Sequence, residues 1–332
     1  MSIINKPNPT AVSLFAGCGG SSLGYKQAGF DIRLAVEWDK GATTVYRRNF
    51  PRTNIFEGDI ADLTAEEALR VTALESGDLD VLDGSPPCQG FSTAGKRKFS
   101  DTRNRLFEEY VRMIEVFKPK MLVMENVSGL RKGKMKLIFA EITRALKKAG
   151  YKISCRELNA WWYGVPQDRR RLIWVGVRED LEAVPGHPEP TVIVPVSAGR
   201  ALGIDGTHSL TPSSFQACPC CLNNPISVTS ISPTIIANGP LKLRNPQFQN
   251  KWKSGSGVSP SLTANKRTSL TDGESVRYLT VEESKILQGF PEWFDIREKE
   301  YKFLGNSVCP PMAKAIGRHI KKIVGDVNYG KK

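Results

Sequence analysis

The chain has 332 residues, of which 40% are hydrophobic and 24% charged, as is ordinary for a globular protein. No stretch approaches the roughly 18 consecutive apolar residues of a membrane span, and residues 1–10 do not resemble a signal peptide, so we expect a cytoplasmic protein with no membrane partner. The net charge of +13 favours a polyanionic partner such as nucleic acid. Seven irregularly spaced cysteines indicate reduced thiols.

The start of the chain has the pattern of a nucleotide-binding α/β unit. An apolar strand at residues 11–16 is followed by a glycine-rich turn at 17–20 and a predicted helix at 21–28. Glycines let the backbone approach a ligand closely. The spacing differs from G-x-G-x-x-G, because the position of the third glycine of that pattern is occupied by Ser22 and the last glycine is Gly24. This difference weakens the case for a nicotinamide cofactor.

The next two predicted strands, residues 32–36 and part of 54–60, are each followed by an acid. Glu37 can accept hydrogen bonds from both ribose hydroxyls of a bound adenosine, and Trp38 can pack on the adenine. Asp59 can accept from the adenine amino group, with Ile60 packing on the ring. For Asp59, a solvated acid at a strand end is the alternative.

A cysteine follows the fourth predicted strand. After a predicted helix at 63–74, that strand ends at Leu82, and Pro86-Pro87-Cys88 comes soon after. Cys88 is a candidate nucleophile, because two prolines stiffen the backbone that presents it. A small core cysteine at a strand end is the alternative.

The following segment, residues 92–105, is polar and basic and contains Lys96, Arg97 and Lys98. Its composition is typical of a mobile functional loop whose cations suit phosphates, although a charge run is also typical of a solvated surface.

A second candidate site residue, Glu125, ends the fifth predicted strand at 121–124, after a helix at 106–118. Ligands of open α/β sheets bind beyond the carboxyl ends of strands, so Cys88 and Glu125 can share a pocket.

Three arginines precede a later strand at residues 172–177. Before it come a predicted helix at 137–149 and a strand at 151–158. Alternate residues of an extended segment point to the same side, so Arg169 and Arg171 both face the pocket and Arg170 lies outside.

Residues 185–260 differ in composition, being rich in Pro, Ser, Thr, Asn and Gly, and they predict a loop-rich β segment. His208 with Cys218, Cys220 and Cys221 invites a zinc interpretation, but the spacing matches no common zinc module, and we expect no metal. Between residues 180 and 258 acids and bases nearly balance, so the positive charge lies mainly elsewhere.

Regular structure is predicted again near the C-terminus. Thr280 and Glu283 form a capping box for a helix at 281–288, and a turn at 303–308 leads into a helix from Pro310 to about residue 324.

Together these motifs resemble DNA (cytosine-5) methyltransferases of the bacterial restriction–modification type. The matching phrases are residues 15–20, 37–39, 58–60, 86–92, 125–127, 167–171, 277–280, 288–291 and 305–308. The resemblance implies a doubly wound, mostly parallel α/β sheet of the Rossmann-like methyltransferase type, with a smaller loop-rich β domain. It implies a catalytic and cofactor-binding domain at 1–179 plus 300–332, a target-recognition domain at 180–275 and a hinge at 276–299.

The activity implied by the resemblance is methyl transfer from S-adenosyl-L-methionine to carbon 5 of a flipped-out cytosine in a short, specific duplex DNA sequence. Cys88 would form a covalent adduct with the base, and S-adenosyl-L-homocysteine would be the product. Glu125 would hold or protonate ring nitrogen 3. Arg169 and Arg171 would contact the base oxygen, a phosphate or Cys88, and a guanidinium also favours the thiolate.

Two further sets of residues carry over from the resemblance. Cofactor contacts fall on Phe15, Gly17, Gly19, Gly20, Glu37, Trp38, Asp59, Ile60, Pro86, Leu106 and Asn306. DNA contacts fall on Gln89, Ser92, Lys96, Arg97 and Lys98. We expect a monomer that binds double-stranded DNA. The resemblance leaves open whether a cognate restriction endonuclease is encoded nearby, and such an enzyme need not bind this protein.

Three other functions compete with this interpretation. An RNA cytosine-5 methyltransferase acting on tRNA would carry a Cys-Phe-Thr signature in the later segment, and the sequence has none. A catalytically silent DNA-binding homologue would not need Cys88, Glu125 and the cofactor turn. A nicotinamide-dependent dehydrogenase is disfavoured by the displaced glycine, the cysteine motif and the net charge.

Overall fold

The structure is a computed structural model that describes residues 7–87, 105–196, 198–202, 242–244, 259–260, 269–271 and 276–328. It divides into two compact units. Unit 1 comprises Met1–Leu158, Arg170–Pro188 and Ala313–Lys332, and unit 2 comprises Asn159–Arg169 and Glu189–Met312. Among the described residues, no helix has the length and apolar character needed to span a bilayer.

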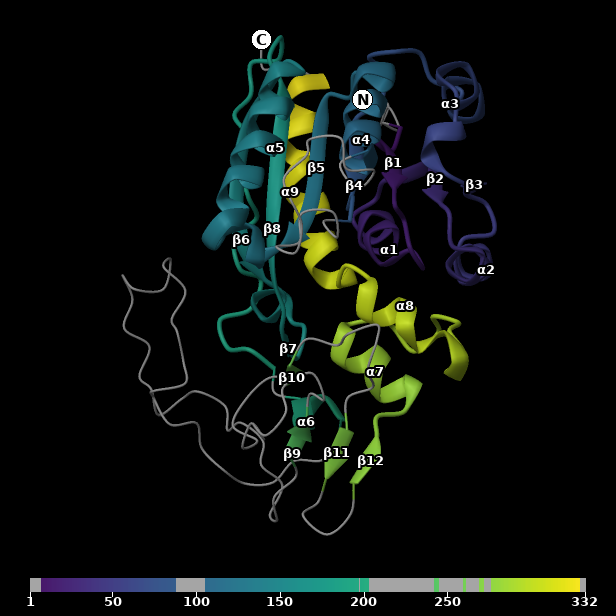
Figure 1. The fold of residues 1–332 in the computed structure, drawn as a ribbon, viewed down its shortest axis with the longest axis vertical. Helices are drawn as coiled ribbons and strands as arrows, with labels where there is room; N and C mark the ends of the chain where they lie inside the picture. The colour runs from purple at the N-terminus through teal and green to yellow at the C-terminus, as the bar shows by residue number, and fades with distance from the viewer. Residues whose placement is uncertain are drawn as a thin grey trace, which may run out of the picture. The chain divides into compact units, whose positions relative to one another are not determined.

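Unit 1 contains a seven-stranded sheet with the order β3-β2-β1-β4-β5-β8-β6 (Figure 1). The strands are β1 (Thr10–Leu14), β2 (Asp31–Glu37), β3 (Asn54–Glu57), β4 (Val81–Gly84), β5 (Met121–Val127), β6 (Tyr151–Asn159) and β8 (Arg170–Arg178). The pairs among β1 to β5 are parallel, and β8 runs antiparallel to β5. The predicted doubly wound, mostly parallel sheet is confirmed, with its switch point between β1 and β4.

Helices cover both faces of this sheet. They are α1 (Gly20–Gln27), α2 (Lys40–Asn49), α3 (Ala65–Thr72), α4 (Arg105–Phe117), α5 (Lys136–Lys148) and α9 (Pro310–Asn328). Neighbouring residues of a strand point to opposite faces. At the end of β4, Gly84 lies against Tyr110 of α4, whereas Asp83 points toward α1. On that second face α9 packs on α1, where Gly317 lies opposite Tyr25.

The main apolar core lies on the α4 face. It joins Leu82 of β4, Met124 of β5 and Trp174 of β8 to Tyr110 of α4 and Ile142 of α5, all of them buried. Tyr110 donates its hydroxyl hydrogen to the carbonyl of Val123, so this large side chain is both packed and hydrogen-bonded. This core fixes the positions of the strands, and therefore of the strand ends that carry the candidate site residues.

Two elements differ from the sequence-based expectations. Helix α2 was not predicted, because its polar sequence contains two threonines and a valine, which are weak helix formers. It begins nonetheless at Asp39, whose side chain accepts from the N–H groups of Gly41 and Ala42. Residues 303–306, predicted as part of a turn, lie in helix α8 (Tyr301–Asn306), where Phe303 and Leu304 are buried.

Unit 2 has little regular structure among its described residues. It contains β7 (Gln167–Asp168), β9 (Lys242–Arg244), β10 (Ser259–Pro260), β11 (Ser269–Thr271), β12 (Val276–Tyr278), α6 (Ala198–Leu202), α7 (Val281–Gln288) and α8. Strand β7 pairs with β10, and β9, β11 and β12 form a three-stranded sheet. The predicted capping box at Thr280 and Glu283 is confirmed for α7.

Asp83 is a buried acid on the α1 face, 4% exposed. Ser13 of β1 donates a hydrogen bond to it over 3.4 Å. Burial, together with the negative charge of Glu125, raises the pKa of Asp83 to about 7, although hydrogen bonds from the hydroxyls of Ser21 and Ser13 oppose the rise. The folded protein therefore holds a proton here at a pH at which an unfolded aspartate, with a pKa of about 3.9, has lost it.

Asp83→Asn is expected to change how stability depends on pH. Because the folded-state pKa of this acid is raised, its stabilising proton is fully present below pH 4 and is lost as pH rises toward 7. Between pH 5 and pH 8, we expect the wild type to lose roughly 2–3 kcal/mol of unfolding free energy relative to the variant.

Urea unfolding of both proteins at the two pH values measures this difference, since other titrating groups cancel in the comparison. Asp62→Asn, at an exposed aspartate, is the matched control. Parallel pH profiles for wild type and Asp83→Asn would contradict the assignment.

Candidate active site

A pocket of about 490 Å³, open solvent at its mouth included, lies in unit 1 at the carboxyl ends of β1 to β4. Its lining residues are Phe15, Val36, Glu37, Trp38, Gly58, Asp59, Ile60, Pro87 and Leu106. All come from strand ends or from the loops beyond them, except Leu106, which lies in the first turn of α4. Two carboxylates in an otherwise mainly apolar pocket suit a ligand that has a flat ring and a few hydrogen-bond donors.

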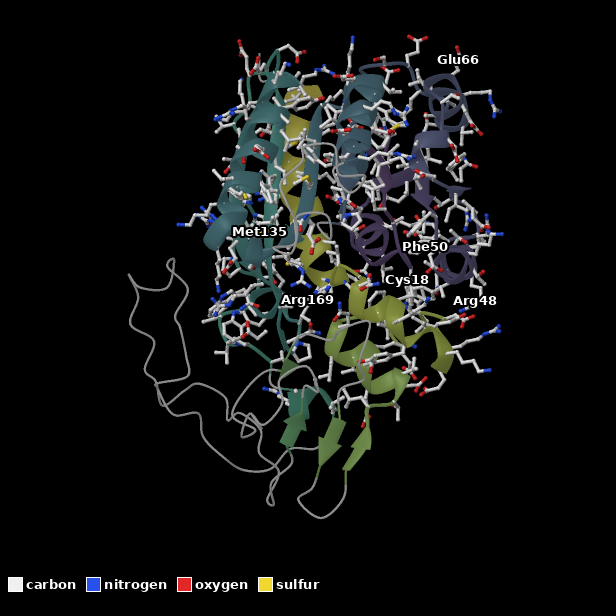
Figure 2. All side chains as sticks on the ribbon, in the orientation of Figure 1. Cys18, Arg48, Phe50, Glu66, Met135 and Arg169 are labelled. Carbon is white, nitrogen blue, oxygen red and sulfur yellow. The ribbon has the colours of Figure 1, made fainter. Side chains whose placement is uncertain are left out.

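The glycine turn after β1 forms one side of this pocket. Phe15 has a positive φ of 56°, which is uncommon for a residue with a side chain. Gly19 has a φ of 97°, and a Cβ there would lie 2.3 Å from the ring of Phe50. The turn therefore packs against the end of α2 in a way that only glycine permits (Figure 2).

Glu37, at the end of β2, binds three backbone N–H groups. Its Oε2 accepts from Gly17 over 2.8 Å, and its Oε1 accepts from Trp38 and Asp39 over 2.9 Å each. A carboxylate has about four acceptor positions, so roughly one, on Oε2, is left for a ligand. Burial raises the pKa of Glu37 above its ordinary value, and the three N–H donors oppose that rise.

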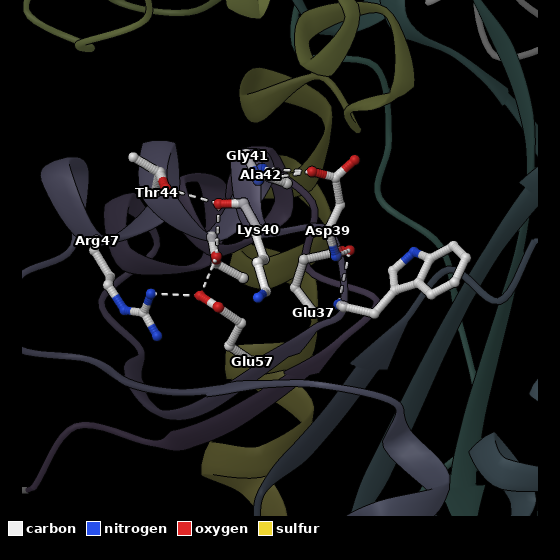
Figure 3. Close-up of polar contacts among 10 residues, drawn as sticks. Glu37, Asp39, Lys40, Gly41, Ala42, Thr44, Arg47 and Glu57 are labelled. Carbon is white, nitrogen blue, oxygen red and sulfur yellow. Dashed lines mark hydrogen bonds and ion pairs between the residues drawn. The ribbon is translucent and has the colours of Figure 1, made fainter.

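The neighbouring contacts hold Glu37 in place (Figure 3). Asp39 caps α2, as described above, and Glu57 at the end of β3 accepts from Thr43 over 2.6 Å. Arg47 pairs with the same Glu57 oxygen. These bonds join α2 to the ends of β2 and β3, while the side chain of Trp38 remains 77% exposed at the pocket.

Asp59 provides the second carboxylate of the pocket. Its Oδ1 accepts from the N–H of Ala61 over 3.0 Å, which caps the short 3-10 helix η1 (Ile60–Asp62). Its Oδ2 accepts from Arg105 over 2.9 Å. Ile60 is buried beside it, and Leu106 supplies an apolar wall from α4.

A second polar site lies where β5 meets β8. Arg171 Nε lies 2.8 Å from Glu125 Oε1, and these side chains are only 15% and 13% exposed. The antiparallel register places Arg171 opposite Val127, two residues from Glu125 on the same face of the sheet. Arg170 points away, is 44% exposed and lies 3.8 Å from Glu157.

Asn126, the residue after Glu125, ties the end of β5 to the loop after β4. It is buried, and its Nδ2 donates to the carbonyl of Pro86 over 3.1 Å. Its Oδ1 accepts from the N–H of Val127. Asn126 has no predicted role of its own, because an asparagine at a strand end gives no signal of its partner. The bond fixes the backbone two residues before Cys88.

Arg169 belongs to a buried network in unit 2. Its Nη2 donates to the carbonyls of Gly305 and Ser307, over 3.1 and 2.9 Å, and the side chain is 2% exposed. Gln288 donates to the same carbonyl of Ser307. Gln167 donates to Gln288 Oε1 over 2.7 Å. Arg169 thus holds the C-terminal end of α8, where Asn306 lies.

The structure places six of the predicted cofactor residues in the pocket: Phe15, Glu37, Trp38, Asp59, Ile60 and Leu106. Gly17, Gly19, Gly20, Pro86 and Asn306 are not among its lining residues, although Gly17 binds Glu37. Pro87, Val36 and Gly58 line it without having been predicted. Cys88, Gln89, Ser92, Lys96, Arg97 and Lys98 lie outside the described residues.

The zinc alternative also falls there, since His208, Cys218, Cys220 and Cys221 lie outside the described residues. Within the described part of the chain, no group of three or more His, Cys, Asp or Glu side chains is placed to hold a metal ion.

Comparison with known proteins identifies the family of this chain. Residues 10–322 match the family described as C-5 cytosine-specific DNA methylase. The chain belongs to this family. Its activity is therefore methylation of cytosine at carbon 5 in DNA, and the family and fold imply catalysis that depends on S-adenosylmethionine.

Two curated relatives share this assignment along almost the whole chain. The type II methyltransferase M.XorII of Xanthomonas oryzae is 34% identical, over 95% of this chain and 85% of its own length. The type II methyltransferase M1.HphI of Haemophilus parahaemolyticus is 34% identical, over 95% and 87%. These relatives place the chain with the methyltransferases of type II restriction–modification systems.

A solved structure supports the fold. A DNA modification methyltransferase encoded within a prophage of E. coli has a TM-score of 0.72 to this chain at 24% identity, covering 96% of this chain and 99% of its own.

Glu37→Gln is expected to loosen the glycine turn. A glutamine has one acceptor oxygen, so its NH₂ group must face either Gly17 or the donors at residues 38 and 39. Losing one buried hydrogen bond costs about 1 kcal/mol, which corresponds to exchange of the affected amide hydrogens several-fold to about tenfold faster.

Hydrogen–deuterium exchange at Gly17, Trp38 and Asp39 measures this effect. Glu115→Gln, at an exposed glutamate of α4, should leave the same amides unchanged. Unaltered exchange at all three amides of the Glu37 variant would contradict the contacts described.

Proposed function

We propose that this protein transfers a methyl group from S-adenosyl-L-methionine to carbon 5 of a flipped-out cytosine in a specific duplex DNA sequence, through a covalent adduct of Cys88. The observation that carries this proposal is the ion pair of Glu125 with Arg171, joined through Asn126 to the carbonyl of Pro86, two residues before Cys88. The last described residues before Cys88 are thereby tied to the strand that carries Glu125.

The pocket in unit 1 fits the adenosine part of the cofactor. Glu37 keeps an acceptor position for the ribose hydroxyls, and Asp59 offers its carboxylate to the adenine amino group. Trp38, Ile60 and Leu106 supply apolar surface for the ring. When bound, the cofactor supplies the methyl group, and the product is S-adenosyl-L-homocysteine.

Cys88 supplies the nucleophile that the reaction needs, because carbon 5 of cytosine is poorly nucleophilic. Addition of the thiolate to carbon 6 breaks the aromaticity and makes carbon 5 enamine-like, so that it takes up the methyl group. Water then removes the carbon 5 proton, and the electron pair of that bond re-forms the double bond as the thiolate leaves.

Glu125 and Arg171 hold the base during these steps. The Glu125 carboxyl takes up a proton from solvent and through it binds or protonates ring nitrogen 3, which withdraws electrons from the ring and stabilises the adduct. Arg171 has further N–H donors for the base oxygen or a phosphate. The two side chains keep each other oriented, and water is largely excluded because both are mainly buried.

Arg169 has a different task from that of Arg171. Its Nη2 binds the carbonyls on both sides of Asn306, and its side chain is buried. We assign Arg169 to holding the C-terminal end of α8, so that Asn306 can contribute to cofactor binding.

The DNA would be bound by both parts of the chain. A base inside a duplex cannot reach Cys88, so it must be flipped out. The basic residues Lys96, Arg97 and Lys98, with Gln89 and Ser92, are proposed to contact the DNA around it, and Lys and Arg release counterions from phosphates. Residues 180–275 are proposed to recognise the sequence, with 276–299 as a hinge. We propose a cytoplasmic monomer that works beside an endonuclease of the same specificity.

Cys88→Ser is expected to abolish activity without abolishing cofactor binding. Wild-type protein incubated with S-adenosyl-L-methionine and duplex DNA containing 5-fluorocytosine at the target should form a covalent complex, because after methyl transfer fluorine cannot leave carbon 5 as a proton would. The variant should form none, and bisulfite sequencing of DNA from cells that express it should show no methylation. Methylation unchanged by the substitution would overturn the mechanism, and preferential methylation of tRNA would overturn the substrate.

Arg171→Lys is expected to lower kcat by at least about tenfold, because lysine cannot bind Glu125 and the base at the same time through a rigid fork. Arg170→Lys, one residue away on the exposed face, should change kcat by less than about twofold. Single-turnover methylation of DNA measures both. Equal losses for the two variants, at equal thermal stability, would contradict the role of the Glu125–Arg171 pair.

A further inference from the structure

The carboxylate of Asp59 is held at both of its oxygens. The N–H of Ala61 binds Oδ1, and the guanidinium of Arg105 binds Oδ2 over 2.9 Å. Each oxygen has two acceptor positions, so each keeps one for another donor. A carboxylate fixed at both oxygens cannot turn freely about its own axis, and its unused acceptor positions therefore point in set directions.

Arg105 is not needed to attach α4 to this part of the fold. Arg112 lies seven residues later on the same helix, and therefore on the same face. Its Nη1 donates to the carbonyl of Leu63 over 3.1 Å, and its Nη2 donates to the carbonyl of Ile60 over 2.8 Å. Arg112 thus ties α4 to the backbone around η1, whereas Arg105, within the described part of the chain, binds the Asp59 side chain.

The Arg105–Asp59 pair is also too exposed to contribute much to folding. The two side chains are 50% and 41% exposed, and pairs of this kind stabilise proteins little. The pair nevertheless lies at the pocket, because Asp59 and Leu106, the residue after Arg105, both line it. We therefore look for the function of the Arg105–Asp59 pair in its position at the pocket, and not in its contribution to stability.

We propose that Arg105 is a positioning residue that orients the Asp59 carboxylate to accept the 6-amino group of the adenine, and so helps to select an adenine-bearing cofactor. This inference rests on the proposed function, which places that ring in the pocket. A carboxylate only accepts hydrogen bonds, so a purine with a 6-amino group is favoured over one with hydrogen at that position. Once a ligand covers the pair, water no longer screens it and the orientation matters more.

The test measures the affinity of wild type and Arg105→Ala for two ligands by calorimetry. One ligand is S-adenosylhomocysteine, and the other is the same molecule with hydrogen in place of the 6-amino group. Wild type is expected to prefer the first ligand. Arg105→Ala is expected to lower the affinity for S-adenosylhomocysteine by about three- to tenfold. The affinity for the second ligand should change by less than about twofold. Arg105→Lys should restore part of the preference.

Two controls separate orientation from general damage. Arg70→Ala, at an exposed arginine of α3, should change neither affinity, and all variants should unfold at the wild-type temperature. An equal loss for both ligands in Arg105→Ala, or no loss for either, would overturn the inference while leaving the proposed function intact. A wild type that binds S-adenosylhomocysteine but shows no preference for the 6-amino group would do the same. A wild type that binds neither ligand would overturn the proposed function and this inference with it.

Discussion

The ion pair between Glu125 and Arg171 is the constraint on which the catalytic side of the structure depends. Two mainly buried charges are costly to remove from water unless each is well paired, so the pair tolerates little error in placement. The register of β8 against β5 supplies that placement. A shift of one residue would bring Arg170 to the inner face and turn Arg171 outward. The antiparallel strand is therefore what selects one arginine from three consecutive ones.

The proposed cofactor pocket depends on the hydrogen bonds that hold Glu37. Three of the acceptor positions of its carboxylate are occupied by N–H groups from the glycine turn and from the residues just before α2. Burial of Glu37 would be unfavourable without them, as the rise in its pKa shows. In the proposed function, the ribose hydroxyls of the ligand would meet a carboxylate whose position is already fixed, so that binding would need to order little.

Much of this arrangement could be predicted from the sequence, because strand ends carry local signals. Apolar runs that stop at an acid located Glu37, Asp59 and Glu125, and the parallel sheet brings the first two to one pocket. Partners distant in sequence gave no such signal. Asn126 binds a carbonyl 40 residues earlier, and Arg169 binds carbonyls more than 130 residues later. Which of two adjacent prolines lines the pocket was equally undetermined, since it depends on how the loop leaves β4.

The arginines show why net charge alone overstates the surface available for DNA. Arg112 and Arg169 donate to backbone carbonyls inside the fold. Such guanidiniums replace hydration by fixed acceptors, so they are committed before DNA arrives. The cations that can release phosphate counterions are the exposed ones, such as Lys132 and Lys136 next to the end of β5. The salt dependence of DNA binding should therefore follow the exposed lysines and arginines, rather than the whole net charge of +13.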